Sequence, residues 1–259
     1  MTEPLIKIEH VYKTFKGISG DIEALKDVHM NIEENEFVCI VGPSGCGKTT
    51  LMNILAGLET YDGGLVTMKG EPIIGPGIDR GVIFQQYALF PWLTVRKNME
   101  FGLKYRNYSR AQKKEIIDHY MEMVGLTEFA NAYPKELSGG MKQRVAIARG
   151  YATSPEVLLM DEPFGALDAQ TRAQLQEDLL RTWETERKTC FFITHDVEEA
   201  VLLSQKVVLM SARPGRVKET IKIDLPYPRN QETKLLPRYN EIKNYIWGNV
   251  YQEYLSVKK

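Results

Sequence analysis

Short apolar runs alternate with amphipathic stretches over much of the chain. Residues 37–41 and 157–160 are continuous apolar segments, as expected for strands that are covered on both faces of a sheet. Residues 191–193 and 207–210 repeat this pattern, and the intervening stretches carry apolar residues at helical spacing. Strands that alternate with helices predict an α/β fold with a mainly parallel sheet.

Two regions depart from this pattern. Apolar alternation over 5–8 and 28–32, followed by glycine-punctuated short runs over 63–83, predicts strands and turns. Residues 95–150 have a mostly helical pattern, with an apolar stripe at Ile116, Ile117, Tyr120, Met121 and Val124. The sequence therefore predicts an N-terminal antiparallel β subdomain and a helical subdomain inserted into the α/β core.

We expect a single domain over 1–259. Its core and β subdomain comprise about 5–86 and 151–225, its helical subdomain about 87–150, and a C-terminal helical tail about 226–259. In the tail, Ile242, Ile246 and Val250 recur at helical spacing. The aromatic residues of this tail either cover the core or assist dimerisation.

Composition narrows the class of protein. The 259 residues are 43% hydrophobic and 26% charged, as in ordinary globular proteins, and no apolar run approaches the ~20 residues that span a bilayer. Residues 1–4 lack the pattern of a secretion signal. A net charge of -1 argues against broad nucleic-acid binding, so we expect no nucleic-acid partner.

The three cysteines, Cys39, Cys46 and Cys190, have no metal-ligand spacing, which predicts reduced thiols in a cytoplasm. Cys46 is either a thiol activated by a helix N-terminus or a small loop residue without chemistry.

Residues 42–49 match the phosphate-binding pattern G-x-x-x-x-G-K-[ST]. The match lies between the apolar strand 37–41 and an apolar helical pattern over 51–58, which is the context that the motif requires. Lys48 supplies a charge for the β- and γ-phosphates, and Thr49 supplies a hydroxyl for Mg²⁺. The candidate ATP-binding residues are Gly42, Pro43, Ser44, Gly45, Cys46, Gly47, Lys48, Thr49 and Thr50.

An acidic pair directly follows the apolar run 157–160. Asp161, at the end of that strand, is a candidate for the Mg²⁺ shell. Glu162 is a candidate for the group that polarises or deprotonates an attacking water. An acidic pair after a strand is common in solvated loops, but its presence beside a phosphate loop favours these catalytic roles.

Residues 137–141 have the sequence Leu-Ser-Gly-Gly-Met, and Gln143-Arg144 follow. This segment resembles the signature of the ATP-binding cassette (ABC) ATPases, L-S-G-G-Q, with methionine in place of the glutamine. Ser138, Gly139 and Gly140 open a helix whose N–H groups and serine hydroxyl suit a γ-phosphate. The resemblance implies that this helix completes the ATP site of a second subunit.

Further residues resemble other elements of the family. Gln85 is similar to the glutamine that touches Mg²⁺ or water and senses the transport partner, although the adjacent Gln86 is an alternative. His195 resembles the switch histidine, in which a neutral imidazole bonds the γ-phosphate and orients the catalytic carboxylate. Together with Lys48 and Glu162 of the motifs above, the resemblance gives four candidate catalytic residues: Lys48, Gln85, Glu162 and His195.

Two more positions follow from the same resemblance. Asp168 in Ala166-Leu167-Asp168 is similar to the loop at which two cassettes meet. Phe15 resembles the aromatic residue that stacks on adenine, and Tyr12 is the competing candidate.

Residues 75–81, 90–95, 161–168 and 211–215 are similar to the importers for nitrate, sulfonates, taurine and related small ions. The resemblance implies ATP and Mg²⁺ as cofactors and a second ABC ATPase subunit, identical or related, as partner. It also implies a polytopic permease, an extracytoplasmic solute-binding protein that acts indirectly, and a peripheral position on the cytoplasmic face of the membrane.

Two other functions fit the same fold. A cassette that transports no solute usually carries either two ATPase units or a long coiled coil, and this chain has neither pattern. A regulatory module that binds ATP without turnover loses the catalytic glutamate or histidine, whereas Glu162 and His195 are both present. The transported solute stays open, since this subunit does not contact it.

Overall fold

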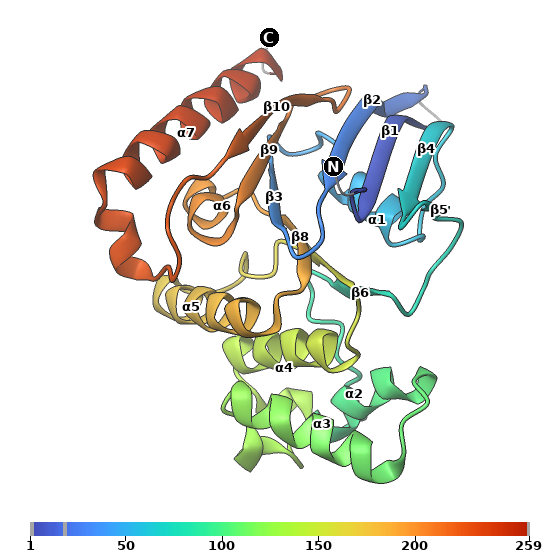
Figure 1. Cartoon of the computed structure of the whole chain (residues 1–259), viewed down its shortest axis with the longest axis vertical. Helices are drawn as coiled ribbons and strands as arrows, with labels where there is room; N and C mark the ends of the chain where they lie inside the picture. Colours follow the sequence, from blue (N-terminus) through green and yellow to red (C-terminus); the bar gives the residue numbers. More distant parts are fainter. Residues whose placement is uncertain (1–2, 18–19, 258–259) are drawn as a thin grey trace.

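The computed structural model describes residues 3–17 and 20–257. Within this part of the chain, the central sheet has six strands in the order β10-β9-β3-β8-β7-β6 (Figure 1). All neighbouring pairs are parallel except β10 and β9, which are antiparallel. The strands are β3 (Phe37–Val41), β6 (Arg80–Ile83), β7 (Val157–Asp161), β8 (Thr189–Ile193), β9 (Lys206–Met210) and β10 (Val217–Lys222).

A second, antiparallel sheet has the order β2-β1-β4-β5 in the described residues. Its strands are β1 (Ile6–Phe15), β2 (Ile22–Ile32), β4 (Gly63–Met68) and β5 (Glu71–Pro72). Helix α1 (Lys48–Leu55) lies between the two sheets, because its apolar residues share one buried cluster with side chains of both. The prediction of a mainly parallel core with an N-terminal antiparallel sheet is therefore confirmed.

The helices of 95–152 gather at one end of the molecule, below the central sheet in Figure 1. They are α2 (Val95–Gly102), α3 (Arg110–Met123) and α4 (Gly139–Ala152), with short 3₁₀ turns at Leu103–Tyr105, Thr127–Phe129 and Pro134–Glu136. Ile117, Tyr120 and Met121 of the predicted stripe are buried, as amphipathic spacing requires. These helices form the predicted helical insert. The subdomain boundaries given above stay a prediction.

The remaining helices cover the face of the central sheet that lies opposite α1 (Figure 1). They are α5 (Ala169–Glu186), α6 (Val197–Leu203) and α7 (Pro237–Val257), with a 3₁₀ turn at Gln231–Leu235 before α7. Side-chain alternation in β8 explains the two layers, since Phe191 joins the cluster around α1 and Phe192 joins the cluster under α5 and α6. Burial of each ring stabilises the fold by about 1.5–3 kcal/mol.

One helix is shorter than its sequence pattern indicates. The apolar spacing continues to Leu58, but α1 ends at Leu55, and Leu58 is 51% exposed. Gly57 has a φ of 71°, the left-handed conformation with which glycine ends many helices. No helix in the described residues has the length and apolar character needed to cross a membrane.

The topology places the predicted motifs together. Strands β3, β8 and β7 are neighbours, so the segments that follow their carboxyl ends meet at one edge of the sheet. The phosphate loop follows β3, His195 follows β8, and the acidic pair lies at the end of β7.

Candidate functional site

The phosphate loop wraps around the ammonium group of Lys48. Lys48 Nζ donates hydrogen bonds to the carbonyl oxygens of Gly42 at 2.8 Å and Pro43 at 3.1 Å. Gly47, directly before α1, has a φ of 88°, and a Cβ there would lie 2.6 Å from the Leu25 side chain. Only glycine fits this backbone, so the loop can present its N–H groups and the helix N-terminus to an anion.

A cavity of about 850 Å³ opens in front of this loop. Phe15, which is 38% exposed, lines this cavity, whereas Tyr12 does not. The cavity is lined by Phe15, Asp21, Ile22, Glu23, Ala24, Ser44, Gly45, Gly47, Lys48, Thr49, Thr50, Glu162, Arg213 and Pro214. This placement supports Phe15 over Tyr12 as the adenine-stacking residue.

Three residues of the predicted ATP-binding segment lie behind the cavity rather than on its wall. Gly42, Pro43 and Cys46 are buried, and the first two act through their carbonyl contacts with Lys48. Burial raises the pKa of the Cys46 thiol, although the nearby Lys48 charge opposes this effect. The neutral thiol is therefore favoured, which supports a packing role for Cys46 over a reactive one.

Thr49 and Asp161, two of the predicted magnesium ligands, are in direct contact at the end of β7. Thr49 Oγ1 donates a hydrogen bond of 3.0 Å to Asp161 Oδ2, although 112 positions separate the residues. Hydroxyl and carboxylate oxygens are ligands that suit Mg²⁺, which usually takes few protein ligands and completes its shell with phosphate and water. The donor set therefore fits this ion. Burial, and secondarily the Glu162 charge, raise the pKa of Asp161 above its ordinary value.

Glu162 is the centre of a small polar group. Its Oε2 lies 3.1 Å from His195 Nδ1 and accepts a hydrogen bond from Gln85 Nε2 at 3.4 Å. Its backbone N–H donates to the Ile193 carbonyl at 2.9 Å, and its φ of 43° is unusual for a residue with a side chain. The structure thus brings Gln85, Glu162 and His195 together, with Gln85 rather than Gln86 at the carboxylate.

The contact between His195 and Glu162 refines the role expected of the imidazole. An ionised carboxylate only accepts hydrogen bonds, so Nδ1–H must donate to it. A neutral ring donates from one nitrogen only, and its Nε2 then lacks the hydrogen that a phosphate oxygen requires. A neutral His195 can therefore serve either the carboxylate or the phosphate, and the imidazolium alone can serve both at once.

The signature residues lie away from this cavity. Ser138 is the N-cap of α4, and its Oγ accepts a hydrogen bond from the Met141 N–H at 3.3 Å. Ser138 and Gly139 are exposed, whereas Gly140 lies so close to α5 that a Cβ would come within 2.5 Å of the Thr171 methyl group. The helix N-terminus is thus open to a partner, and it is packed directly against the start of α5.

Asp168 caps α5 in the same region. Its Oδ1 accepts a hydrogen bond of 3.0 Å from the Thr171 N–H, and this contact lowers the pKa of the Asp168 carboxyl. Like Ser138 and Gly139, Asp168 is exposed and does not line the cavity. The single chain therefore places Ser138, Gly139, Gly140 and Asp168 outside the pocket that holds Lys48.

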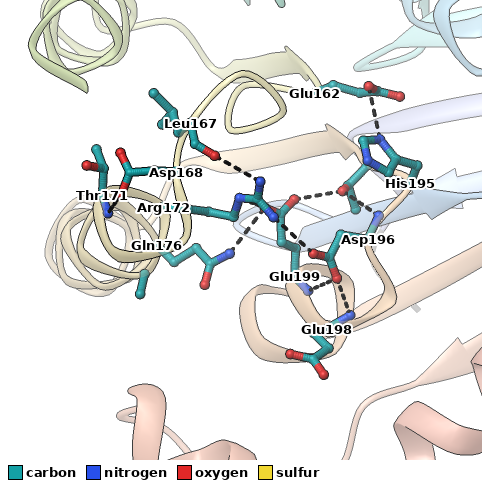
Figure 2. Close-up of polar contacts among 12 residues, drawn as sticks. Glu162, Leu167, Asp168, Thr171, Arg172, Gln176, His195, Asp196, Glu198 and Glu199 are labelled. Atoms are coloured by element: carbon teal, nitrogen blue, oxygen red, sulfur yellow. Dashed lines mark hydrogen bonds and ion pairs between the residues drawn. The ribbon is translucent and has the colours of Figure 1, made fainter. Parts of the chain in front are cut away.

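Sequence reasoning missed two features. Arg213 lines the cavity beside the phosphate loop, since the pairing of β9 with β3 brings the turn after β9 to the loop after β3. A polar group around Arg172 and Glu199 joins the start of α5 to the segment of His195 (Figure 2). The sequence motif at 211–215 includes Arg213 and could have pointed to it, whereas no motif marked Arg172 or Glu199.

A buried lysine in a strand–loop–helix, with a threonine and two carboxylates at neighbouring strand ends, defines an ATP-binding protein of the P-loop class. Comparison with known proteins assigns the family, because the ABC transporter family model matches residues 25–165. The nitrate import ATP-binding protein NrtD of Synechocystis sp. is 49% identical over 234 residues, which cover 89% of this chain and 88% of that protein.

The aliphatic sulfonates import ATP-binding protein SsuB of Bacillus cereus is 43% identical over 249 residues, which cover 95% of this chain and 98% of that protein. A solved dimeric ATP-binding cassette, in a post-hydrolysis state with ADP and Pi, superposes with a TM-score of 0.75 at 35% identity, covering 85% of this chain and 100% of that one. The chain belongs to the ABC transporter family, and it is an ATPase.

Proposed function

We propose that this chain is the ATP-hydrolysing subunit of an importer for a small anion or zwitterion such as nitrate, a sulfonate or taurine. It would lie on the cytoplasmic face of the membrane, bound to a polytopic permease that receives solute from an extracytoplasmic binding protein. The similarity to NrtD and SsuB supports the substrate class. The observation that carries the catalytic part is that Lys48 and Glu162 line the same cavity, with His195 in contact with the Glu162 carboxylate.

In the proposed site, ATP lies with its phosphates on the loop 42–49 and its adenine against Phe15. Thr49, Asp161 and Gln85 would hold Mg²⁺, which supplies charge neutralisation of the phosphates when bound. Lys48 neutralises the β- and γ-phosphates, and Glu162 orients and deprotonates the attacking water. Gln85 and His195 hold the Glu162 carboxylate in place through the contacts of 3.4 and 3.1 Å.

We propose that a second cassette, identical or related, completes each site with Ser138, Gly139, Gly140 and Asp168. All four residues lie outside the cavity, and Ser138, Gly139 and Asp168 are exposed, which supports this arrangement; the dimeric solved relative is consistent with it. ATP that bridges two chains stabilises the closed pair by its additional affinity for that state. Hydrolysis removes the bridging phosphate contacts, and the pair opens.

An apolar groove next to Gln85 supports docking of a permease segment. The groove has a volume of about 420 Å³ between β6, α2 and α4, and its lining includes the aromatic residues Phe84, Phe90, Phe101 and Tyr105. Arg149 of α4 donates hydrogen bonds to the carbonyl oxygens of Tyr87 at 3.2 Å and Ala88 at 2.8 Å. A segment seated in this groove would thus touch both the Gln85 loop and the signature helix.

The docking proposal is tested by replacing Tyr105, which is 72% exposed in the groove, with aspartate. We expect Tyr105→Asp to keep the ATPase activity of the isolated chain and to lose co-purification with the proposed partner permease. It should also lose ATP-driven solute uptake in proteoliposomes. Leu235→Asp is the matched control, because Leu235 is 79% exposed and outside the groove. Uptake by Tyr105→Asp at the rate of the control would contradict this proposal.

A further inference from the structure

Two turns lie beside the contact between Glu162 and His195, and a cluster of polar side chains connects these turns (Figure 2). The first turn ends at Leu167 and Asp168, where α5 begins, and the second contains His195, between β8 and α6. Arg172 from α5 and Glu199 from α6 lie between the two turns. The mechanism proposed above uses neither of these side chains.

Glu199 holds the backbone around His195. Its side chain is nearly fully buried, and its Oε2 accepts a hydrogen bond of 2.7 Å from Thr194 Oγ1. The same Thr194 oxygen accepts a hydrogen bond of 3.0 Å from the Asp196 N–H. Glu199 thereby fixes the residues on both sides of His195 through one hydroxyl group. Gln176 Nε2 donates to the other Glu199 oxygen at 3.2 Å.

Arg172 reaches from the first turn to the second. Its Nη2 donates a hydrogen bond of 3.0 Å to the Leu167 carbonyl. Its Nη1 lies 3.6 Å from Asp196 Oδ2, and its Nε lies 3.9 Å from Glu199 Oε1. The Nε atom is buried and has no hydrogen-bond partner within the described residues, so the neighbouring carboxylates balance its charge without a direct bond. One guanidinium group therefore contacts both turns.

We propose that Arg172 and Glu199 are positioning residues, which join the Leu167–Asp168 turn to the turn of His195 and so set the imidazole against Glu162. The inference rests on the catalytic roles proposed for Glu162 and His195. It also couples the dimer contact to the catalytic site. A partner chain that contacts the exposed Asp168 would displace the turn that Arg172 holds. Displacements of about 1 Å at a catalytic group can lower a rate about a hundredfold, so a small shift of this turn is sufficient.

The proposal is tested by steady-state ATPase assays of Arg172→Gln and Glu199→Gln. We expect kcat to fall about tenfold or more while the KM for ATP stays within about twofold, since the phosphate loop is untouched. Arg181→Gln is the matched control, with the same change on an exposed residue of the same helix, and it should behave as wild type. Glu199→Gln keeps the side-chain shape, so it carries the test if Arg172→Gln lowers the melting temperature.

A double-mutant cycle with His195→Ala separates positioning from general support of the fold. If Arg172 acts through the imidazole, Arg172→Gln should lower kcat much less in the His195→Ala background than in wild type. An equal fall in both backgrounds, or a wild-type kcat in both Arg172→Gln and Glu199→Gln, would overturn the inference. A wild-type kcat in His195→Ala would overturn the proposed role of His195 as well. A low kcat in His195→Ala beside wild-type rates in the two positioning variants would overturn this inference alone.

Discussion

Replacing Glu162 with glutamine separates the proton-accepting role of this side chain from its packing. Glutamine has the same length, and its amide oxygen can still accept the hydrogen bond from His195 Nδ1, which lies 3.1 Å from Glu162 Oε2. The side chain of its partner His195 is 63% exposed, so the change leaves no buried charge unpaired. The substitution therefore keeps the geometry of the site and removes the base.

The expected fall in the rate of ATP hydrolysis follows from the loss of the general base alone. A positioned general base contributes about 10²–10⁴ to a rate. That factor corresponds to about 3–5 kcal/mol of activation free energy, at 1.36 kcal/mol for each factor of ten. ATP affinity should change little, because the contacts of Lys48 with the loop do not involve Glu162. The variant should therefore hold uncleaved ATP and accumulate as a closed dimer.

Three measurements test this prediction together. Single-turnover hydrolysis should be slower by 10²–10⁴, equilibrium binding of ATP should match wild type, and light scattering should show a dimer that persists with ATP. Asp161→Asn serves as a contrast, because it should weaken the response to Mg²⁺. Hydrolysis by Glu162→Gln within about twofold of wild type, with ATP fully bound, would refute the assignment of Glu162 as the base.

Two further predictions concern the composite site and the buried carboxylate. Ser138→Arg should abolish ATPase activity and dimer closure while ATP binding on Lys48 stays intact, as measured by equilibrium dialysis and gel filtration. Burial raises the pKa of Asp161 above its ordinary value of 3.8, so its stabilising contribution is present below that pH and is lost as the pH rises through the folded pKa. Asp161→Asn should thus raise the melting temperature of the nucleotide-free chain at neutral pH, and the gain should vanish at about pH 4 or below. A lower melting temperature of Asp161→Asn at pH 7 would show that the Thr49 contact outweighs the burial.

The elements that sequence predicts best are those with strong local signals. The glycines of the phosphate loop determine its backbone conformation, as Gly47 shows. The apolar strand before the acidic pair places that pair at a strand end. Their meeting could also be expected, since parallel strands end at one edge. The end of α1 was predicted less well, because the apolar pattern continued to Leu58 past the glycine that ends the helix.

The parts of the site that depend on long-range contacts could not be predicted from the sequence. Arg213 reaches the cavity only through the pairing of β9 with β3, which no local pattern encodes. Arg172 and Glu199 stand 27 positions apart on two helices, where a charged residue usually predicts a solvated face. Their position between two turns depends on how α5 and α6 pack on the sheet. Sequence therefore predicted the residues that touch the phosphates better than those that hold them in place.

If each ATP site is built from two chains, two inactive variants that lack opposite halves of the site should restore activity when they are mixed. Lys48→Ala lacks the phosphate-binding lysine, and Ser138→Arg lacks the opposing helix start, so each variant alone should hydrolyse almost no ATP. A mixed pair contains one site with both Lys48 and Ser138 intact. We expect the mixture to hydrolyse ATP far faster than the sum of the two variants. A mixture that stays at that sum, or a Ser138→Arg chain that is fully active by itself, would contradict it.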